Sequence, residues 1–289
     1  MEIVITGAGG YIGQKLTERF RSESHECIPV KREFLNGRVE KISELLAGTD
    51  IVINLAGAPV FQRWTFRNKE EIYNSRVLTS QKLCSAIHLL PAAKRPKTFI
   101  SISAVGIYKA GETHDESSIR FDNSFTGKLV QDWESASASL PVDVRRIIFR
   151  TGMVIGKDSK TIQQLLPVFK AGLGGKTGNG KQAFPFIHID DVVSAFSWAI
   201  NSPKTEGIFN LVAPQTITNK KFTDQLAKEL NKPAFFTIPS FLLRLIFGKA
   251  SQLITKSPVV IPRQLLQCGF VFTKPAIEEA LHNIGNPDQ

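Results

Sequence analysis

The sequence predicts an α/β fold, with a doubly wound parallel sheet followed by a smaller, mostly helical C-terminal unit. Short apolar runs alternate with amphipathic segments as far as Arg150, which is typical of a parallel sheet wrapped by helices. A glycine-rich turn follows the first apolar run directly. From Thr218 onward, capped helical segments replace the alternating pattern.

The elements of the sheet are expected in βαβ order. Strands are predicted at residues 3–6, 26–30, 50–56, 98–103 and 144–150, and helices near residues 11–21, 67–88 and 125–138. This order implies right-handed crossovers and places ligands at the carboxyl ends of the strands.

The turn after the first strand contains glycines in the pattern Gly7-x-x-Gly10-x-x-Gly13, with Tyr11 and Ile12 between the last two. It opens the first helix, so its glycines allow close backbone approach to a pyrophosphate whose charge meets the N–H groups of the helix N-terminus. The turn therefore predicts a dinucleotide-binding site of the Rossmann type.

The end of the second strand indicates which dinucleotide binds. An acidic residue there favours NAD(H), whereas cations suit the 2′-phosphate of NADP(H). This chain has Lys31 and Arg32 at that point, and Arg32 could bind a phosphate through two hydrogen bonds. We expect NADP(H) in preference to NAD(H), although Glu33 leaves NAD(H) open and both cations could be solvated loop residues.

The third strand runs into "INLAGAPV". The small residues Ala56 and Gly57 would let the backbone lie against the adenosine side of the cofactor, with Asn54 fixing the turn.

After Arg150 the glycine-rich stretch "AGLGGKTGNGKQAFPF" suits a loop over a ligand, and "GIFNLVA" predicts a strand that returns to the sheet. We expect a dinucleotide-binding domain of residues 1–160 and about 185–215. The remaining residues, about 161–184 and 216–289, are expected to form a smaller substrate-binding domain.

Charge and cysteine content limit the partners. The net charge is +10, but the cations are scattered and no recognition motif accompanies them, so we expect a small-molecule substrate and no nucleic acid. The 3 cysteines form no C-x-x-C pair, which predicts reduced thiols and no metal site.

The apolar run "FFTIPSFLLRLIFG" is interrupted by Pro239 and Arg244 and is shorter than the roughly 20 residues of a membrane span. We interpret it as a buried strand and helix, and expect no membrane partner. The chain begins almost directly with a strand and shows no targeting segment, so a cytoplasmic location is expected.

Longer segments carry a family resemblance: "FQRWTFRNKEEIYNSRVLTSQKL", "IIFRTGMVIG", "GLGGKTGNGKQAFPFIHIDDVV" and "VVIPRQLLQCGFVF". Together with the glycine turn they resemble the extended short-chain dehydrogenases/reductases, and in particular the atypical epimerase family proteins, a sugar-nucleotide epimerase-like group with a C-terminal domain of unknown function. The resemblance implies cofactor contacts at Leu55, Ala56, Glu71, Arg76 and Arg150. Phe186 stands where relatives commonly carry Trp.

Ordinary members of that superfamily use a Tyr as general acid/base, a Lys four residues later that lowers the pKa of the Tyr, and a Ser or Thr on the fourth strand. Here Phe125 stands near the Tyr position. The candidates that remain are Ser103, where a shift of one residue would place Ala104, and Lys128, at the wrong interval from Phe125.

A Y-x-x-x-K pattern does occur, at Tyr11 and Lys15, but it lies in the first helix beneath the expected pyrophosphate and away from the nicotinamide. We interpret it as a coincidence.

Three further polar groups could face a substrate. Tyr108 could donate a proton or pack beside the cofactor. The run His114, Asp115 and Glu116 could contact substrate or be an exposed acidic loop. His188, Asp190 and Asp191 resemble an acid/base cluster, but a structural turn in which Asp190 caps the next helix is the commoner arrangement.

Two functions remain open. One is an NADP(H)-dependent oxidoreductase or epimerase that acts on a nucleotide-sugar-like or small carbonyl substrate with another proton donor. The other is a catalytically silent NADP(H)-binding redox sensor or regulatory protein. The enzyme is preferred narrowly because the glycine-rich loop and second domain could enclose a ligand. A monomer and a homodimer are both open.

Overall fold

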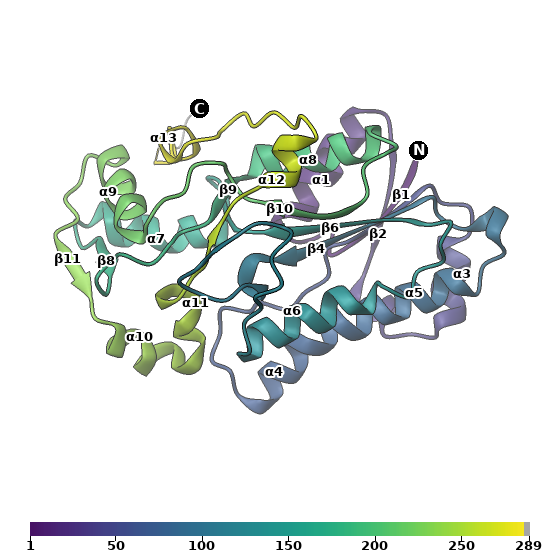
Figure 1. Ribbon diagram of the computed structural model, residues 1–289, viewed down its shortest axis with the longest axis horizontal. Coiled ribbons are helices and arrows are strands. Elements are labelled where there is room, and N and C mark those ends of the chain that lie inside the picture. The colour runs from purple at the N-terminus through teal and green to yellow at the C-terminus, as the bar shows by residue number, and fades with distance from the viewer. Residues whose placement is uncertain (286–289) are drawn as a thin grey trace.

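A computed structural model describes residues 1–285. Its centre is a parallel sheet of 6 strands in the order β10-β6-β4-β3-β1-β2 (Figure 1). The strands are β1 Glu2–Thr6, β2 Glu26–Val30, β3 Ile51–Asn54, β4 Thr98–Ala104, β6 Arg145–Thr151 and β10 Gly207–Leu211. The predicted fold class is confirmed, and each predicted strand lies within a few residues of its expected bounds.

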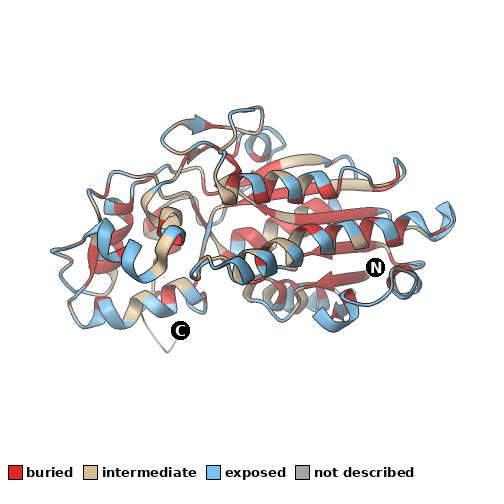
Figure 2. Ribbon diagram, turned by 90° about the horizontal axis from the view of Figure 1, so that it is seen from below, coloured by how far each residue is buried: buried red, intermediate tan, exposed pale blue. Residues whose placement is uncertain are grey.

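Helices cover both faces of this sheet because alternate residues of each strand point to opposite sides. On one face, Ile3 and Ile5 of β1 pack with α1, Tyr11–Ser22, and α8, Ile189–Asn201. On the other, Val4 packs with α3, Val39–Leu46, and α5, Thr79–His88. Figure 2 shows the strands as buried ribbons between helices that are buried on one side only.

The predicted helix 67–88 contains a change of winding. It consists of α4, Phe66–Tyr73, a π-helical turn, Asn74–Leu78, and α5. A π turn inserts one extra residue per turn and is frequent at functional sites. Here it carries Arg76. The helix predicted at 125–138 is α6, Phe125–Ala136.

Three small sheets and several helices complete the fold, and most of them lie after β6 in the chain. The strand pairs are β7 Met153–Ile155 with β9 Phe186–His188, β8 Gly175–Thr177 with β11 Phe236–Ile238, and β5 Thr113–His114 with β12 Val259–Val260. The helices are α7 Lys160–Lys170, α9 Asn219–Glu229, α10 Ser240–Phe247, α11 Gln252–Thr255, α12 Arg263–Gln267 and α13 Ile277–Ala280; α2 Arg32–Leu35 and 3₁₀ turns at Ala92–Lys94, Val105–Ile107 and Gly248–Ser251 complete the fold.

A separate apolar cluster joins α7, α9 and α13 through Ile162, Phe222 and Ile277. This cluster lies in the region expected to form the smaller domain. The division of the chain into two domains stays a prediction, and its last residues, 286–289, lie outside those that the structure describes.

The expectation that "FFTIPSFLLRLIFG" is buried is wrong. Helix α10 turns Leu243 inward, but Phe241 is 73% exposed and Leu245 69% exposed. The cause is geometric: the helix lies at the rim of the molecule, where only one of its faces meets protein. Within residues 1–285, no helix is both long enough and apolar enough to cross a bilayer.

Candidate functional site

The glycine turn fits tightly on the end of β3. Gly7 adopts a φ of +69°, and a Cβ on it would lie 2.6 Å from the carbonyl oxygen of Leu55. A Cβ on Gly13 would lie 2.7 Å from Cα of Ala8. Both positions therefore require glycine for steric reasons. This close packing sets the path of the loop between β1 and α1.

Helix α1 presents open N–H groups at this turn. Its N-cap is Gly10, which has no side chain to cap the first turn, and that turn contains no acidic residue. The first N–H groups of a helix have no intrahelical acceptor, so they can bind an anion. The side chains of Tyr11 and Ile12 are half-buried, and their N–H groups belong to this first turn.

A buried polar contact holds the turn against the neighbouring strand. Thr6 Oγ1 donates to Asn54 Oδ1 at 2.7 Å, and Asn54 Nδ2 donates to Ser80 Oγ at 2.9 Å. Asn54 Oδ1 also accepts from the N–H of Ala56 at 3.3 Å. The prediction that Asn54 fixes the "LAG" turn is confirmed.

Arg76 lies against this turn without an acidic partner. A Cβ on Gly57 would come within 2.9 Å of the Arg76 Cζ, so the guanidinium covers the Gly57 backbone. Its Nη1 donates to the Ile72 carbonyl at 3.2 Å, and its Cζ lies 5.3 Å from the centre of the Trp133 ring. Burial lowers the pKa of Arg76 to about 10, and no carboxylate of residues 1–285 pairs with it.

The cations predicted for the 2′-phosphate stand at the end of β2. Lys31 is the N-cap of α2 and is exposed. Arg32 Nη1 lies 3.2 Å from Oε1 of Glu71 on α4. The structure thus brings Arg32 and Glu71, two of the predicted cofactor residues, to the same edge of the sheet. Lys31, Arg32 and the glycine turn all lie at the carboxyl ends of strands, as a dinucleotide requires.

Arg150 is placed differently from the other predicted cofactor residues. Its side chain is 3% exposed, and its Nε and Nη2 donate to the Glu134 carboxylate at 2.8 and 2.7 Å. Its Nη1 donates to the Tyr108 hydroxyl at 2.8 Å. Burial acts to lower the pKa of Arg150, but the hydrogen bonds and charges of Glu134 and Tyr108 together outweigh burial, and the net pKa is raised. In this arrangement Arg150 is a buried structural cation.

Sequence reasoning missed Glu134. The sequence signal that could have identified Glu134 is a carboxylate on the inward side of α6, next to the buried residues Trp133 and Ala136. Ser103 Oγ also donates to Glu134, at 2.6 Å. Ser103, a candidate catalytic hydroxyl, therefore belongs to the same buried network.

The structure does not assemble the usual acid/base pair. Phe125 packs edge-on against Trp64, with ring centres 5.1 Å apart, and Lys69 Nζ lies 5.1 Å from the centre of the Phe125 ring. Lys128 is exposed on α6, whereas Ser103 is buried. An aromatic cluster occupies the position where a catalytic Tyr is expected.

Tyr11 and Lys15 do not form a catalytic pair either. Burial raises the pKa of the Tyr11 hydroxyl, and the charges of Asp158 and Asp190 raise it further. A general base needs the opposite shift. Lys15 Nζ lies 3.8 Å from Glu18 and 3.9 Å from Asp158. These directions agree with the interpretation of the pattern as a coincidence.

Replacing Tyr11 by Phe should therefore leave dinucleotide affinity within about twofold of the parent, since its hydroxyl makes no hydrogen bond to any of residues 1–285 and its N–H belongs to the first turn of α1. Titration of the cofactor by fluorescence measures this. A loss of more than about tenfold would show that the hydroxyl takes part in the site.

Residues 114–116 are structural rather than an exposed acidic loop. His114 is buried, with Nε2 2.9 Å from the Lys109 carbonyl oxygen and Nδ1 2.8 Å from Ser118 Oγ. Glu116 Oε1 accepts from the N–H of Asn210 on β10 at 2.9 Å and from the N–H of Gln264 on α12 at 3.3 Å. Glu116 therefore joins the edge of the sheet to α12. Asp115 pairs with Arg263 at 2.7 Å.

The turn at His188 is also structural, but the predicted cap is wrong. His188 is the N-cap of α8, and its Nδ1 accepts from the N–H of Asp190 at 3.2 Å. Asp190 lies inside the first turn instead, because the helix begins at Ile189, two residues before the start that a cap at Asp190 would give. Asp191 is buried and accepts from the N–H groups of Thr273 and Lys274 at 2.6 and 3.0 Å.

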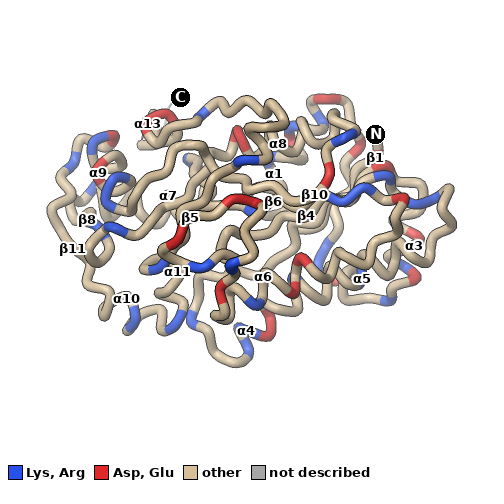
Figure 3. The backbone as a smooth tube through the Cα atoms, in the orientation of Figure 1, with Lys and Arg blue, Asp and Glu red and all other residues tan. Residues whose placement is uncertain are grey.

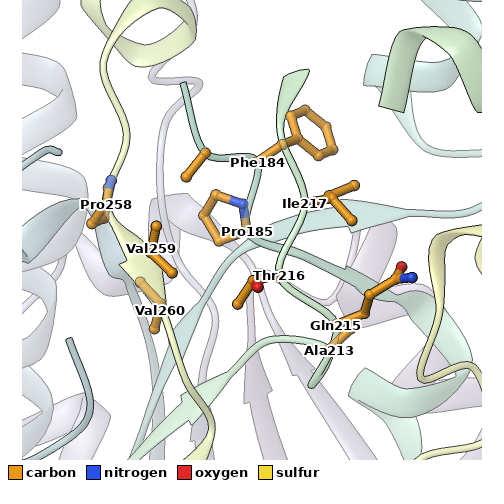
Figure 4. A pocket seen from close by; sticks show the side chains of 10 residues that line it. Phe184, Pro185, Ala213, Gln215, Thr216, Ile217, Pro258, Val259 and Val260 are labelled. Carbon is orange, nitrogen blue, oxygen red and sulfur yellow. The ribbon is translucent and has the colours of Figure 1, made fainter. Parts of the chain in front are cut away.

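A small hollow lies where β10 leaves the sheet, between the loop before β9 and strand β12 (Figure 4). Its cavity volume is about 10 Å³, roughly the room that one water molecule needs, and its lining residues are Ala183, Phe184, Pro185, Ala213, Gln215, Thr216, Ile217, Pro258, Val259 and Val260. None of these residues is charged. No group of His, Cys, Asp and Glu in the described part of the chain is arranged to hold a metal ion.

Two family models match the chain. The model of the NAD dependent epimerase/dehydratase family covers residues 3–211, and that of a domain of unknown function (DUF1731) covers residues 238–284. The chain is 33% identical to the mouse epimerase family protein SDR39U1, over 98% of this chain and 99% of the relative. It is 28% identical to the epimerase family protein YfhF of Bacillus subtilis, over 98% of each chain.

Solved structures are similar over the same extent. A crystal structure of human epimerase family protein SDR39U1 with NADPH superposes with a TM-score of 0.92 at 30% identity, covering 99% of this chain and 100% of that one. A nucleoside-diphosphate sugar epimerase from Corynebacterium glutamicum gives a TM-score of 0.78 at 27% identity, covering 99% of this chain and 58% of that one.

Proposed function

This chain belongs to the NAD dependent epimerase/dehydratase family, and from that membership we propose that it binds NADP(H) and transfers hydride to or from a small carbonyl or nucleotide-sugar-like substrate. The similar human protein was crystallised with NADPH, which supports the choice of cofactor. The observation that carries the proposal is the Arg76 guanidinium, which covers the Gly57 backbone in the turn after β3 and pairs with no carboxylate of residues 1–285.

Arg76 is half-buried and has no acidic partner within residues 1–285, and a cation in such a place favours an anion as its ligand. Arg76 is held in place by the Ile72 carbonyl and the Trp133 ring, which leaves its Nη2 facing the Gly57 backbone. The open N–H groups of α1 supply a second attraction for negative charge. Phosphate groups of a dinucleotide satisfy both, and the residues present therefore fit this cofactor.

Replacing Arg76 by Met separates binding from folding. We expect the affinity for NADPH to fall about tenfold or more, because a charge-assisted contact to phosphate is lost. The free energy of unfolding should stay within about 1 kcal/mol of the parent, since Met fills similar space and removes an unpaired cation. Calorimetric titration and urea denaturation measure the two quantities. Equal losses in both would mean that Arg76 is only a packing residue.

Replacing Arg32 by Ala tests the preference for the 2′-phosphate. We expect about tenfold weaker binding of NADPH and little change for NADH, because only NADPH carries the phosphate that Arg32 would contact. Arg19→Ala is the matched control: Arg19 is an exposed cation at the far end of α1. An equal loss for both cofactors would contradict the assignment of Arg32.

The chemistry would use the hydride that a bound nicotinamide supplies. This chain contributes positioning: the turns after β1 and β3 would hold the cofactor. Because Phe125 has no hydroxyl and Ser103 is engaged with Glu134, we propose that solvent supplies the proton.

The lack of a hydroxyl at Phe125 also favours a second candidate, a catalytically silent NADP(H)-binding protein that acts as a redox sensor or regulator. A panel of carbonyl compounds and nucleotide sugars, incubated with the protein and NADPH, distinguishes the two. Oxidation of NADPH or appearance of an epimer supports the enzyme. Tight NADPH binding with no turnover across the panel supports the silent protein.

A further inference from the structure

An exposed apolar face lies on the C-terminal unit. We use "apolar face" for the large side chains of β11, its preceding residue and α10 that are open to solvent: Phe235, Phe236, Phe241, Leu242, Leu245 and Ile246. Phe235 is 90% exposed, and Ile246 is 54% exposed. Large apolar side chains gathered in this way mark a surface that is covered by a partner.

The winding of α10 explains why this face is open. Leu243 and Phe247, four residues apart, point inward, and the Phe247 ring packs against Phe61 with ring centres 4.5 Å apart. Phe241 and Leu245, also four residues apart, point outward. A helix that is apolar on nearly all sides is normally enclosed. Here one side alone meets protein.

The fold holds α10 in this position. Arg63 Nη2 donates to the Leu245 carbonyl at 3.3 Å, which ties the C-terminal end of the helix to the loop after β3. Gly248, with a φ of +59°, ends the helix beside Arg63. The apolar face is therefore presented by an anchored helix, and α10 lies at the rim of the molecule (Figure 1).

The surroundings of the apolar face are cationic. Between residues 230 and 277 the sequence contains no Asp or Glu. Of the cations in this stretch, Arg244 lies on α10 and Lys249 follows it, whereas Lys274 lies beside Asp191 of α8. Arg263 pairs with Asp115 of another segment. Arg63 and Arg67, from the loop and helix next to α10, are exposed as well, followed on α4 by Glu70 and Glu71. Figure 3 shows blue and no red along α10.

We propose that the apolar face binds peripherally to the surface of an anionic lipid bilayer. Short helices with Phe and Leu on one side and Lys or Arg at the flanks lie in the membrane interface, where the apolar side chains enter the acyl boundary and the cations meet acidic headgroups. Arg244 lies within α10 itself, and Lys249 follows its last turn. An anionic bilayer accounts for both the exposed apolar side chains and the lack of carboxylates along α10. A protein partner accounts for the apolar side chains alone.

Flotation of the full-length protein with vesicles tests the proposal. We expect binding to vesicles of phosphatidylcholine with phosphatidylglycerol, little binding to phosphatidylcholine alone, and release as salt rises from about 0.1 M to about 1 M. The double variant Phe241→Ser/Leu245→Ser should reduce the partition coefficient about tenfold or more. Its control is Leu89→Ser/Ile119→Ser, which removes two exposed apolar side chains elsewhere and should bind like the parent.

Each outcome decides the matter. NADPH affinity and circular dichroism confirm that the variants are folded. Equal binding of the parent and Phe241→Ser/Leu245→Ser, or no binding to anionic vesicles, would overturn the proposal. Sedimentation without lipid tests a second copy of the chain as the partner. If the parent is a dimer and Phe241→Ser/Leu245→Ser is a monomer, the apolar face binds that second copy instead.

Discussion

Glu134→Gln is expected to lower the free energy of unfolding by about 3–5 kcal/mol, because it leaves Arg150 charged, buried and without a counter-charge. Glu134 receives hydrogen bonds from Arg150 Nε at 2.8 Å, Arg150 Nη2 at 2.7 Å and Ser103 Oγ at 2.6 Å. Gln keeps the volume but has one acceptor oxygen and no charge. Urea denaturation followed by circular dichroism measures the loss.

Two further variants test whether the unpaired charge of Arg150 causes this loss of stability. Asp224→Asn breaks an exposed pair with Lys220, whose side chains are 50% and 58% exposed, and should cost no more than about 0.5 kcal/mol. Glu134→Gln/Arg150→Met removes the stranded cation as well and should recover part of the stability. If the double variant were less stable than Glu134→Gln by the full cost of a second core defect, the stranded-charge explanation would fail.

Gly13→Ala is expected to weaken NADPH binding by about a hundredfold, because the added methyl group would force the glycine turn away from its present path. The methyl group would meet the carbonyl oxygen of Gly7 and, at 2.7 Å and 2.9 Å, backbone atoms of Ala8, none of which can rotate aside. Some loss of stability, about 1–3 kcal/mol, should accompany it. Calorimetric titration gives the affinity and thermal denaturation the stability.

Gly9→Ala is the matched control for folding, since a Cβ on Gly9 meets nothing within 4 Å and its φ is not positive. Its stability should equal that of the parent within about 0.5 kcal/mol. Parent-like NADPH binding by Gly13→Ala would contradict the steric argument for the turn, and with it the role of that turn in placing the cofactor.

The central sheet was predictable because its signals are local. A parallel strand buried on both faces is recognised by its short apolar run, and the glycine turn by its spacing after the first of them. The same holds for Asn54, whose contact to Ala56 lies two residues away. The placement of Lys31 and Arg32 at a strand end also follows from the order of elements alone.

Predictions failed or stayed open where contacts join distant segments. Arg150 is paired with Glu134, 16 residues earlier, so neither its burial nor its partner can be inferred from the motif around it. Glu116 reaches Gln264, 148 residues later. The π turn arises inside an ordinary helical pattern, and it places Arg76 against Gly57.

The sequence by itself determined the α/β architecture, the glycine turn and the cationic end of β2, since periodicity, glycine geometry and element order act over short distances along the chain. Only the tertiary structure decided that Arg76 has no acidic partner among the described residues, that Ser103 and Arg150 share Glu134, and that the outer side of α10 is open. These properties depend on which surfaces meet after folding. An apolar run encodes the tendency to be covered, and the packing of the whole molecule decides whether the chain itself covers it.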